Sequence, residues 1–399
     1  MKQGWEIKKL RDVVFFQRGL TYSKKDEVDF SNNVVLRSNN VDLKTNKLDF
    51  KEIRYINNKI MIPDNKKIVL GALLICTANG SKSHLGKVAL IDIDYQYAFG
   101  GFMGLLIPKN NLNSDFLFYA MTSQNYRNFI SALSDGANIN NLKFLDLGKF
   151  EIPIPSLSEQ QYIVDLLDKA FVSISNAKAN AEQNLKNTKG LFESYLQNVF
   201  ANKGKDWEKK TLGDVCEISS KLIDPKILEF QDLIHIGGGN IESKTGTLLN
   251  LKTAKEEGLI SGKFIFDDTM VLYSKIRPYL VKVVRCEFSG LCSADIYPLV
   301  PFKNVMIRDF LYYLLLTINF TEYAILGSQR AGMPKVNRNH LFEYNFHLPP
   351  LQVQKSIVQK LDELSSECKK LESIYQKKVI ALDELKKSIL QKAFSGQLS

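Results

Sequence analysis

The side chains in this sequence that could do chemistry are mainly basic and amide groups in loops, and they recur at matching places in two halves of the chain. A basic loop reads "GSKSHLGKV" at 80–88 and "SKIRPYLVKV" at 274–283. The recurrence favours contact with phosphates or bases, although for any single lysine a solvated hairpin is the simpler explanation. The candidates in these loops are Lys82, His84 and Lys87, and Lys275, Arg277 and Lys282.

A second set of polar groups follows an apolar, strand-like stretch in each half. The segment "RSNN" at 37–40 comes after "VVL", and Asn240 comes after "GGG" at 237–239. Arg and Asn carry the paired donors and acceptors that read guanine and adenine edges, so this segment and Asn240 are predicted to contact DNA. The glycines lack the G-x-G-x-x-G spacing of a cofactor loop and predict a turn. The candidates in this set are Arg37, Ser38, Asn39, Asn40 and Asn240.

A third polar loop follows a helical pattern in each half, as "DGANINNLK" at 135–143 and "GSQRAGMPKVNRNH" at 327–340. A loop held by a rigid helix is a common place for recognition residues. A connector that is polar only for solubility would have the same composition, and the pattern does not separate the two explanations. The candidates are Asn138, Asn140 and Lys143, and Gln329, Arg330, Lys335 and Arg338.

Motifs for catalysis, metal binding and nucleotide binding are not recognised. The first basic loop resembles a phosphate-binding P-loop, but five residues rather than four separate Gly80 from Gly86, and Val88 stands where a hydroxyl is needed. The four histidines lack metal-ligand spacing. No nucleophile elbow or paired-carboxylate constellation stands out. We therefore expect no catalytic residue, no metal and no cofactor in this chain.

The elements that position these loops form an internal repeat. The segment "GWEIKKLRDVV" from Gly4 corresponds to "DWEKKTLGDVC" from Asp206, and "FMGLLIPKN" corresponds to "DIYPLVPFKN". Between them, short apolar runs rich in β-branched residues predict strands, and one longer helical pattern in each half ends before Gly136 and Gly327. The prediction is two similar α+β domains, at residues 1–152 and 202–347.

Each predicted domain is followed by a long helix, at 153–201 and 348–399. The two copies align without a gap from Leu157 to Phe200 and from Leu351 to Phe394. Prolines exclude helix just upstream, and Ser158 with Gln161 resembles a capping box. The apolar spacing predicts a coiled-coil seam, with a stutter in the first helix. Two helices of equal length can pack on each other, and spacing alone leaves their orientation open. The second seam is Ile357, Leu361, Leu364, Cys368, Leu371, Tyr375, Lys378, Leu382, Leu385 and Ile389.

Composition bounds the possible partners. The chain has 399 residues and a formal net charge of +10. The helical segments are nearly balanced in charge, so the surplus lies mainly in the two globular domains and favours a polyanionic partner. No apolar stretch reaches the roughly 18–20 residues of a membrane helix, and the N-terminus lacks the apolar run of a secretion signal, so we expect a cytoplasmic protein and no membrane partner. The five cysteines form no C-x-x-C pair and are expected to be reduced thiols.

The whole chain resembles the specificity subunits of type I restriction-modification systems. The resemblance rests on the P-x-L-x-x-Q pattern, on the W-x-x-K-x-L start of each half, and on the domain–helix–domain–helix order. Each motif alone is weak, but the ordered set occurs twice. The residues that carry it are Trp5 and Trp207, Asn40 and Asn240, Pro155, Leu157 and Gln160, and Pro349, Leu351 and Gln354.

The resemblance implies two target-recognition domains in a pseudo-two-fold internal repeat, separated by two antiparallel helices that form a coiled-coil spacer. Each domain would read one half of a split, asymmetric site in double-stranded DNA. The helices would dock two modification subunits, which bring S-adenosylmethionine and methylate adenine at N6. ATP and Mg²⁺ would belong to restriction subunits, where these are present. The chain itself would be non-catalytic within this endonuclease and methyltransferase complex.

Two other classes stay open at this point. A coiled-coil scaffold that binds only protein would explain the helices but leaves the surplus of positive charge outside them unexplained. A self-contained DNA-modifying enzyme would need a catalytic motif of its own.

Overall fold

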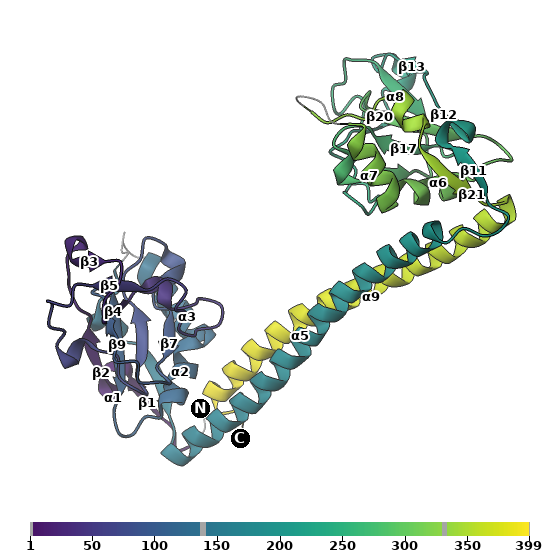
Figure 1. Cartoon of the computed structure of the whole chain (residues 1–399). Helices are drawn as coiled ribbons and strands as arrows, with labels where there is room; N and C mark the ends of the chain where they lie inside the picture. The colour runs from purple at the N-terminus through teal and green to yellow at the C-terminus, as the bar shows by residue number, and fades with distance from the viewer. Residues whose placement is uncertain (1–2, 136–140, 329–332, 399) are drawn as a thin grey trace. The chain divides into compact units, whose positions relative to one another are not determined.

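The computed structural model describes residues 3–135, 141–328 and 333–398 (Figure 1). The chain divides into two compact units, residues 1–182 with 377–399 and residues 183–376. Each unit holds one globular domain and one half of each long helix. The predicted boundaries treat the helices as separate segments, whereas the contacts group each helix half with the domain on which it packs.

The globular domain of the first unit contains two four-stranded sheets. The first sheet is antiparallel in the order β2-β9-β6-β7, and in the second, ordered β3-β5-β4-β8, only β4 and β8 are parallel. The strands are β2 (Val14–Arg18), β3 (Glu27–Val28), β4 (Asn33–Leu36), β5 (Arg54–Ile56), β6 (Leu73–Cys76), β7 (Val88–Leu90), β8 (Ala98–Phe99) and β9 (Met103–Pro108).

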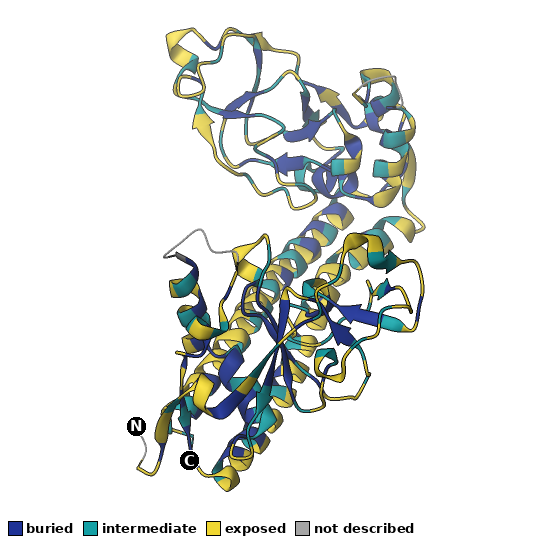
Figure 2. Ribbon diagram, turned by 90° about the vertical axis from the view of Figure 1, so that its left-hand side faces the viewer, coloured by how far each residue is buried: buried dark blue, intermediate teal, exposed yellow. Residues whose placement is uncertain are grey.

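Strand β6 lies at the centre of this domain because both of its faces are covered. Leu73 and Ile75 pack in the core shared with the helices, and Leu74 and Cys76 pack in a second core on the other side. All four residues are buried, as Figure 2 shows for the central strands. The unbroken apolar run of β6 is the pattern expected of a strand buried on two sides.

The single longer helix predicted in each domain is wrong, since each is broken into two. Ser123 leaves the helical conformation and its Oγ accepts a hydrogen bond from the Tyr126 amide at 3.3 Å. Thr317 does the same for Phe320 at 3.3 Å. A side chain that caps the next helix competes with helix continuation. The helices are α2 (Ser114–Thr122) and α3 (Gln124–Asp135) in the first domain, and α6 (Arg308–Leu315) and α7 (Ile318–Leu326) in the second.

The second domain repeats this arrangement and confirms the predicted repeat. Its sheets have the orders β12-β20-β17-β18 and β13-β16-β19-β14-β15. The strands are β12 (Cys216–Ile218), β13 (Leu222–Ile223), β14 (Ile234–Ile236), β15 (Lys252–Thr253), β16 (Lys263–Phe266), β17 (Val271–Ser274), β18 (Val283–Arg285), β19 (Gly290–Cys292) and β20 (Ile296–Pro301).

A two-stranded antiparallel ribbon closes each domain next to its long helix. β1 (Glu6–Lys9) pairs with β10 (Glu151–Ile154), and β11 (Glu208–Thr211) pairs with β21 (Asn345–Leu348). The remaining short helices are α1 (Leu10–Val13), α4 (Phe144–Leu147) and α8 (Arg338–Phe342), with 3-10 turns η1 (Lys24–Asp26), η2 (Ser38–Asn40), η3 (Asp64–Lys66), η4 (Lys82–His84), η5 (Leu212–Asp214), η6 (Leu228–Phe230) and η7 (Pro278–Leu280).

The two long helices are α5 (Leu157–Ala201) and α9 (Leu351–Ser395), and they run antiparallel within each unit. In the first unit, Lys178 Nζ lies 2.7 Å from Asp383, and Lys386 Nζ lies 4.8 Å from the centre of the Phe171 ring. This confirms the orientation that the family resemblance implied. No described helix is long and apolar enough to cross a membrane.

The predicted seam of α5 is covered along its whole length, since none of its residues is exposed: Ile163, Leu167, Ala170, Ile174, Ala177, Ala181, Leu185, Thr188, Phe192, Tyr195 and Val199. On α9, Leu361 and Cys368 are buried, but Leu371 and Leu385 are exposed. The seam prediction therefore holds for α5 and only in part for α9.

The start of each long helix is fixed by one buried glutamine rather than by the predicted capping box. Gln160 Oε1 accepts the Asn113 amide at 2.8 Å, and its Nε2 donates to the Asn111 and Pro155 carbonyls at 3.1 and 2.9 Å. Helix α5 begins one residue after Ser156, whose Oγ accepts the Glu159 amide at 3.4 Å, so the capping serine is Ser156, and Ser158 lies inside the helix.

In the second repeat, Gln354 makes the hydrogen bonds that Gln160 makes in the first. Gln354 Oε1 accepts the Ile307 amide at 2.9 Å, and its Nε2 donates to the Val305 and Pro349 carbonyls, each at 2.9 Å. Both glutamines are fully buried. The P-x-L-x-x-Q pattern thus ties each helix to the loop that precedes α2 or α6, which positions the domain on the helix.

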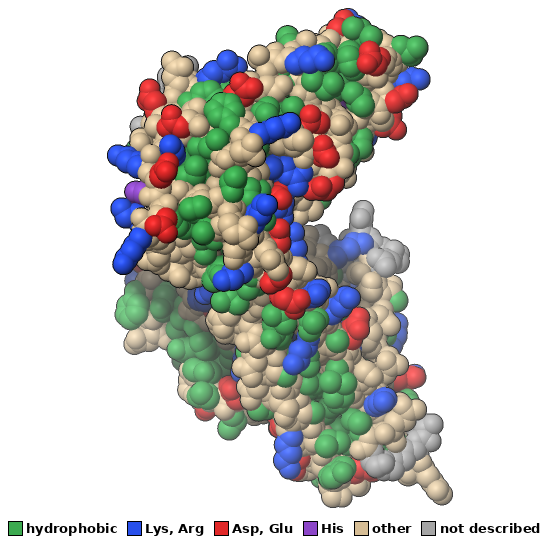
Figure 3. Space-filling view, turned by 90° about the vertical axis from the view of Figure 1, so that its right-hand side faces the viewer, with side chains coloured by type: hydrophobic (Ala, Val, Ile, Leu, Met, Phe, Trp, Pro, Cys, Tyr) green, Lys and Arg blue, Asp and Glu red, His purple; other side chains and the backbone are tan. Residues whose placement is uncertain are grey.

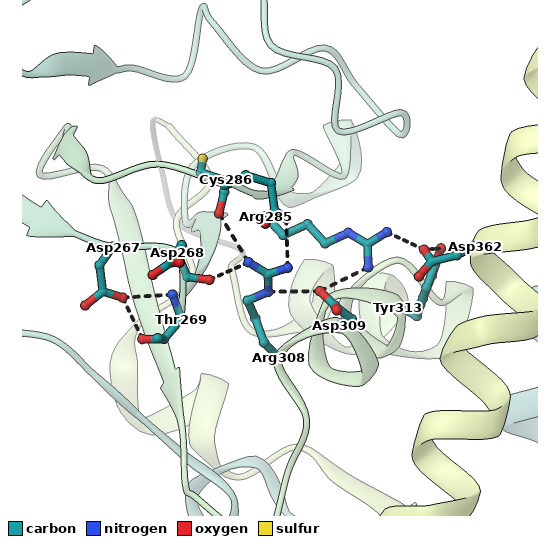
Figure 4. A network of polar contacts seen from close by, with 10 residues as sticks. Asp267, Asp268, Thr269, Arg285, Cys286, Arg308, Asp309, Tyr313 and Asp362 are labelled. Carbon is teal, nitrogen blue, oxygen red and sulfur yellow. Dashed lines mark hydrogen bonds and ion pairs between the residues drawn. The ribbon is translucent and has the colours of Figure 1, made fainter.

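A polar network joins the second domain to α9 (Figure 4). Arg285 pairs with Asp309 at 3.0 Å and with Asp362 on α9, and Tyr313 Oη donates to Asp362 at 2.6 Å. Arg308 donates to Asp309 at 2.9 Å and to the Asp268 and Cys286 carbonyls. Burial lowers the pKa of Arg285, but Asp362 and Asp309 outweigh it and raise this pKa above its ordinary value.

The first domain keeps the carboxylates and the tyrosine but not the arginines. Tyr119 donates to Asp168, as Tyr313 does to Asp362. By strand register, Leu90 stands where Arg285 stands, because each faces the first residue of the neighbouring central strand. Burial and then the charge of Asp168 raise the pKa of Asp115. Within the described part of the chain, neither Asp115 nor Asp168 has an ion-pair partner.

Candidate nucleic-acid interface

The three predicted loops of the first domain converge at one end of the sheets. Asn79 Nδ2 donates to Ser38 Oγ at 2.9 Å, which joins the first loop to the basic loop. The Leu142 amide donates to the Thr77 carbonyl at 2.6 Å, which joins the third loop to the end of β6. Segments far apart in the sequence therefore form one continuous surface.

The second domain brings together the same three loops. The Val336 amide donates to the Lys275 carbonyl at 2.8 Å, and the Arg277 amide donates to the Pro334 carbonyl at 2.9 Å. Lys282 Nζ donates to the Gly238 carbonyl, which ties the basic loop to the glycine turn. The glycines form a turn, as predicted.

The side-chain amides of Asn40 and Asn240 form hydrogen bonds with backbone groups of their own domains. Asn40 is fully buried. Its Oδ1 accepts the Arg37 amide at 2.8 Å, and its Nδ2 donates to the Asp49 and Glu52 carbonyls, each at 2.8 Å. Asn240 accepts from the Gly237 amide at 2.8 Å and donates to two carbonyls in the same way. Because the Asn40 amide is buried and bonded internally, the prediction that it reads a base is wrong; Asn240 makes the same bonds but is partly exposed, and its contact with DNA stays a prediction.

Lys87 is an internal clamp between loops, which contradicts its prediction as a DNA contact, whereas Lys282 is partly exposed and its contact with DNA stays a prediction. Lys87 is only 2% exposed, and its Nζ donates to the Val41 carbonyl at 2.7 Å and lies 2.9 Å from His84 Nδ1. Burial lowers the pKa of Lys87, and burial followed by the charge of Lys87 lowers the pKa of His84. His84 is therefore neutral at pH 7 and accepts from the lysine through Nδ1.

Other candidates of the first domain remain at the surface. Asn39 is exposed and donates to the Glu52 side chain at 3.2 Å. Arg37 is partly exposed and lies 3.7 Å from Glu27. Lys82 and Lys143 are exposed. These groups surround the junction of the three loops and can reach a ligand without unfolding.

The second domain holds a group of cations, which we call the cationic cluster: Lys275, Lys335 and Arg338. Burial and then the charge of Lys335 lower the pKa of Lys275, the carboxylate of Asp295 offsets part of this shift, and the charge of Arg338 adds a smaller lowering. Lys275 donates to the Ala294 carbonyl and lies 4.9 Å from the centre of the Tyr297 ring. Like charges held together repel one another, and an anion placed among them relieves the repulsion. The cluster is therefore suited to binding phosphate.

The basic loop of the second domain also has an unusual backbone. Arg277 and Val281 both have left-handed conformations, with φ of 51° and 48°, on either side of η7. A β-branched residue such as valine rarely adopts this conformation, and such strain concentrates at binding sites. Arg277 is exposed beside the cationic cluster.

Four predicted contacts, Asn138, Asn140, Gln329 and Arg330, lie outside the described residues. Sequence reasoning missed one exposed aromatic side chain, Phe102, beside the loop junction. The alignment of "FMGLLIPKN" with "DIYPLVPFKN" pairs Phe102 with Asp295. A position that holds a charged residue in the other repeat is typical of the protein surface, and this pairing could have indicated that Phe102 is exposed.

Among the described residues, no group of His, Cys, Asp or Glu side chains is arranged to hold a metal ion. All five cysteines are buried and free. Burial raises the pKa of the Cys76 thiol to about 11, which makes it a poor nucleophile. On the face shown in Figure 3, Lys and Arg side chains are interspersed with Asp and Glu.

Comparison with known proteins places this arrangement in a family. The family model described as "Type I restriction modification DNA specificity domain" matches twice, at residues 2–186 and 204–381. The specificity subunit of the Escherichia coli type I restriction enzyme EcoDI is 30% identical over 72% of this chain and 71% of its own length. The specificity subunit of StySPI from Salmonella potsdam is 25% identical over 100% of this chain and 90% of its own length.

Solved structures show the same fold. A chain from a study of complex assembly and conformational transition of a type I restriction-modification system has a TM-score of 0.76 at 21% identity, covering 100% of this chain and 99% of that one. The HsdS subunit from Thermoanaerobacter tengcongensis has a TM-score of 0.66 at 20% identity, covering 100% and 98%. With the domain model matching both halves, the chain belongs to the family of type I restriction-modification DNA specificity subunits.

Proposed function

We propose that this chain is the sequence-specific DNA-recognition subunit of a type I restriction-modification complex, and that each globular domain reads one half of a bipartite, asymmetric site in double-stranded DNA. The observation that carries the proposal is the convergence of three polar loops in both domains. In the second domain this convergence brings Lys335 and Arg338 close enough to Lys275 for their charges to lower its pKa.

Two kinds of contact with DNA are proposed, one to phosphates and one to bases. Cations at the loop junctions neutralise phosphates and release counterions, which gives affinity without sequence preference. Side chains that reach base edges give specificity. The first domain offers Arg37 and Asn39 where the second has the glycine turn, so the two half-sites are expected to differ.

The proposed contacts are those candidates whose side chains reach the surface. They are Arg37, Ser38, Asn39, Lys82, His84 and Lys143 in the first domain, and Asn240, Lys275, Arg277, Lys282, Lys335 and Arg338 in the second. Asn138, Asn140, Gln329 and Arg330 are retained on sequence grounds.

The long helices are proposed to act as spacer and docking surface for two modification subunits. Both helices carry exposed apolar side chains that their own pairing leaves uncovered, which favours a protein partner on this surface. They include Val172, Leu191, Ile374 and Ile380. S-adenosylmethionine, for adenine methylation, would bind the modification subunits, and ATP and Mg²⁺ would bind restriction subunits where these join. The proposal places the chain in the cytoplasm, with the DNA.

The decisive experiment is to purify the chain with a modification subunit and to map methylated adenines in genomic DNA. A split motif with two different halves is expected. Methylation or cleavage by the purified chain alone would indicate a self-contained enzyme. Absence of salt-sensitive DNA affinity in the complex, with both proteins bound to each other, would indicate a protein scaffold and overturn the proposal.

A further inference from the structure

Phe102 occupies a fixed place at the junction of the three loops. Its carbonyl accepts the amides of Thr77 and Ala78 at 2.9 and 3.1 Å, directly after β6. Phe102 lies within a turn that is closed by the Met103 amide, which donates to the Gly100 carbonyl at 2.8 Å. Phe102 is therefore held between the end of β6 and the start of β9, beside the residues that join the basic loop to Ser38.

The turn that carries Phe102 cannot shift easily. The Gly100 amide donates to the Leu36 carbonyl at 2.9 Å, at the end of β4. Gly19 packs so closely against Gly100 that a Cβ at Gly19 would collide with the Gly100 carbonyl. Despite this rigid backbone, the Phe102 side chain is 70% exposed. Single exposed apolar side chains are common on protein surfaces, but Phe102 differs from the others in its place, on a rigid turn that is hydrogen-bonded to the end of β6 at the junction of the loops proposed to bind DNA.

The second domain has the same backbone position with different chemistry. The Lys275 amide donates to the Asp295 carbonyl at 3.0 Å, as the Thr77 amide does to the Phe102 carbonyl. Ile296 then begins β20, as Met103 begins β9. One structural position therefore presents an apolar ring in the first domain and a carboxylate in the second.

We propose that Phe102 is a specificity-determining residue of the first half-site, and that its ring packs against the C5-methyl group of a thymine in the major groove. This inference rests on the proposed function. A phenyl ring has neither a charge nor a hydrogen-bond donor with which to bind a phosphate oxygen. The thymine methyl is the apolar group that base pairs present in the major groove. At the equivalent position, Asp295 can accept a hydrogen bond only from a donor such as the cytosine amine, so the two half-sites differ at the base this position reads.

The test uses the full chain in complex with its modification subunit and compares Phe102→Ala with wild type. The variant is expected to relax the first half of the methylation motif at one position and to leave the second half unchanged. Phe30→Ala is the matched control. Phe30 is 78% exposed in the same domain, but it precedes β4, at the opposite end of that strand from the loop junction. The control should keep the wild-type motif.

A chemical probe isolates the methyl group. Each thymine of the first half-site is replaced in turn by deoxyuridine, which lacks only the C5-methyl group. At one position the wild-type complex should lose about fourfold in affinity, the value of roughly one buried methyl group. Phe102→Ala should bind the two DNAs equally, because the ring that met the methyl is gone.

The outcomes separate this inference from the proposed function. If wild type reads no split motif, the proposed function fails. If wild type reads one and Phe102→Ala keeps it, or if every deoxyuridine site binds wild type as well as thymine does, the inference fails and the proposed function stands. A uniform loss of affinity on all DNAs in Phe102→Ala would also overturn it, because the ring would then make a contact without specificity.

Discussion

Arg285→Met should loosen the second domain from α9, and the structure allows the size of the effect to be worked out. The Arg285 side chain is 24% exposed, and it pairs with the side chains of Asp309, 25% exposed, and Asp362, 40% exposed. It also lies 4.9 Å from the centre of the Tyr312 ring. Methionine keeps much of the side-chain volume but none of the hydrogen bonds.

The bond to Asp309 is charge-assisted and largely buried, so its net contribution is about 2 kcal/mol. Asp362 is exposed enough that its pair is discounted to roughly 0.5 kcal/mol. The contact with the Tyr312 ring adds about 0.5 kcal/mol. In the variant, Asp309 still accepts the hydrogen bond from Arg308, and Asp362 still accepts the one from Tyr313. Neither carboxylate is therefore left without a partner. The expected loss is about 3 kcal/mol, or about 6–12 °C in the unfolding midpoint of a domain of this size.

The assay is urea unfolding of the full chain, with hydrogen exchange to locate the change in α6 and at residues 351–376. Leu90→Met, at the equivalent position of the first domain, is the matched control and should leave exchange in the second unit unaltered. In an Asp362→Asn background, Arg285→Met should cost less than in wild type, by about 0.5–1 kcal/mol. A loss below 1 kcal/mol, or equal losses in both backgrounds, would refute the reasoning.

Four further outcomes are expected. Gln354→Leu should lower the free energy of unfolding by roughly 2–4 kcal/mol, because it leaves three buried backbone groups unpaired; an unchanged urea midpoint would contradict this. The pKa of Asp115 is raised, so the stability that its protonated form provides is lost as pH rises through that pKa. Asp115→Asn should therefore have a higher unfolding temperature than wild type at pH 7, and this difference should vanish below pH 3.8, the ordinary pKa of an aspartate; a difference in unfolding temperature that persists in acid would count against the predicted sign. Lys335→Gln with Arg338→Gln should reduce the slope of log affinity against log salt by about 1 per lost phosphate contact, and an unaltered slope would exclude both from the phosphate contacts. Deleting one heptad from each long helix removes about 10 Å of rise and should change the tolerated gap by about three base pairs at roughly 3.4 Å each without changing either half-site; methylome mapping would reveal an unchanged gap and refute the spacer.

The internal repeat and the long helices could be predicted from the sequence because they rest on spacing. A helix tolerates no insertion, so the gap-free alignment after Leu157 and Leu351 was direct evidence of regular structure. The α+β class followed in the same way from alternating short strands and helical patterns. The break at Ser123 and at Thr317 was missed because a capping hydroxyl and a tolerated helical hydroxyl look alike in sequence.

The sequence by itself determined which loops carry polar groups, and only the tertiary structure decided which of those groups face outward. Asn39 and Asn40 are the same residue at adjacent positions, yet the first is exposed and the second fully buried. Both side chains donate to the Glu52 carbonyl, but only the Asn40 amide also donates to the Asp49 carbonyl and accepts the Arg37 amide. The buried Lys87 ammonium group likewise donates its hydrogen bond to the Val41 carbonyl. Hydrogen-bond partners supplied by distant segments leave no local pattern, so the folded chain alone separates structural amides and amines from those available to DNA.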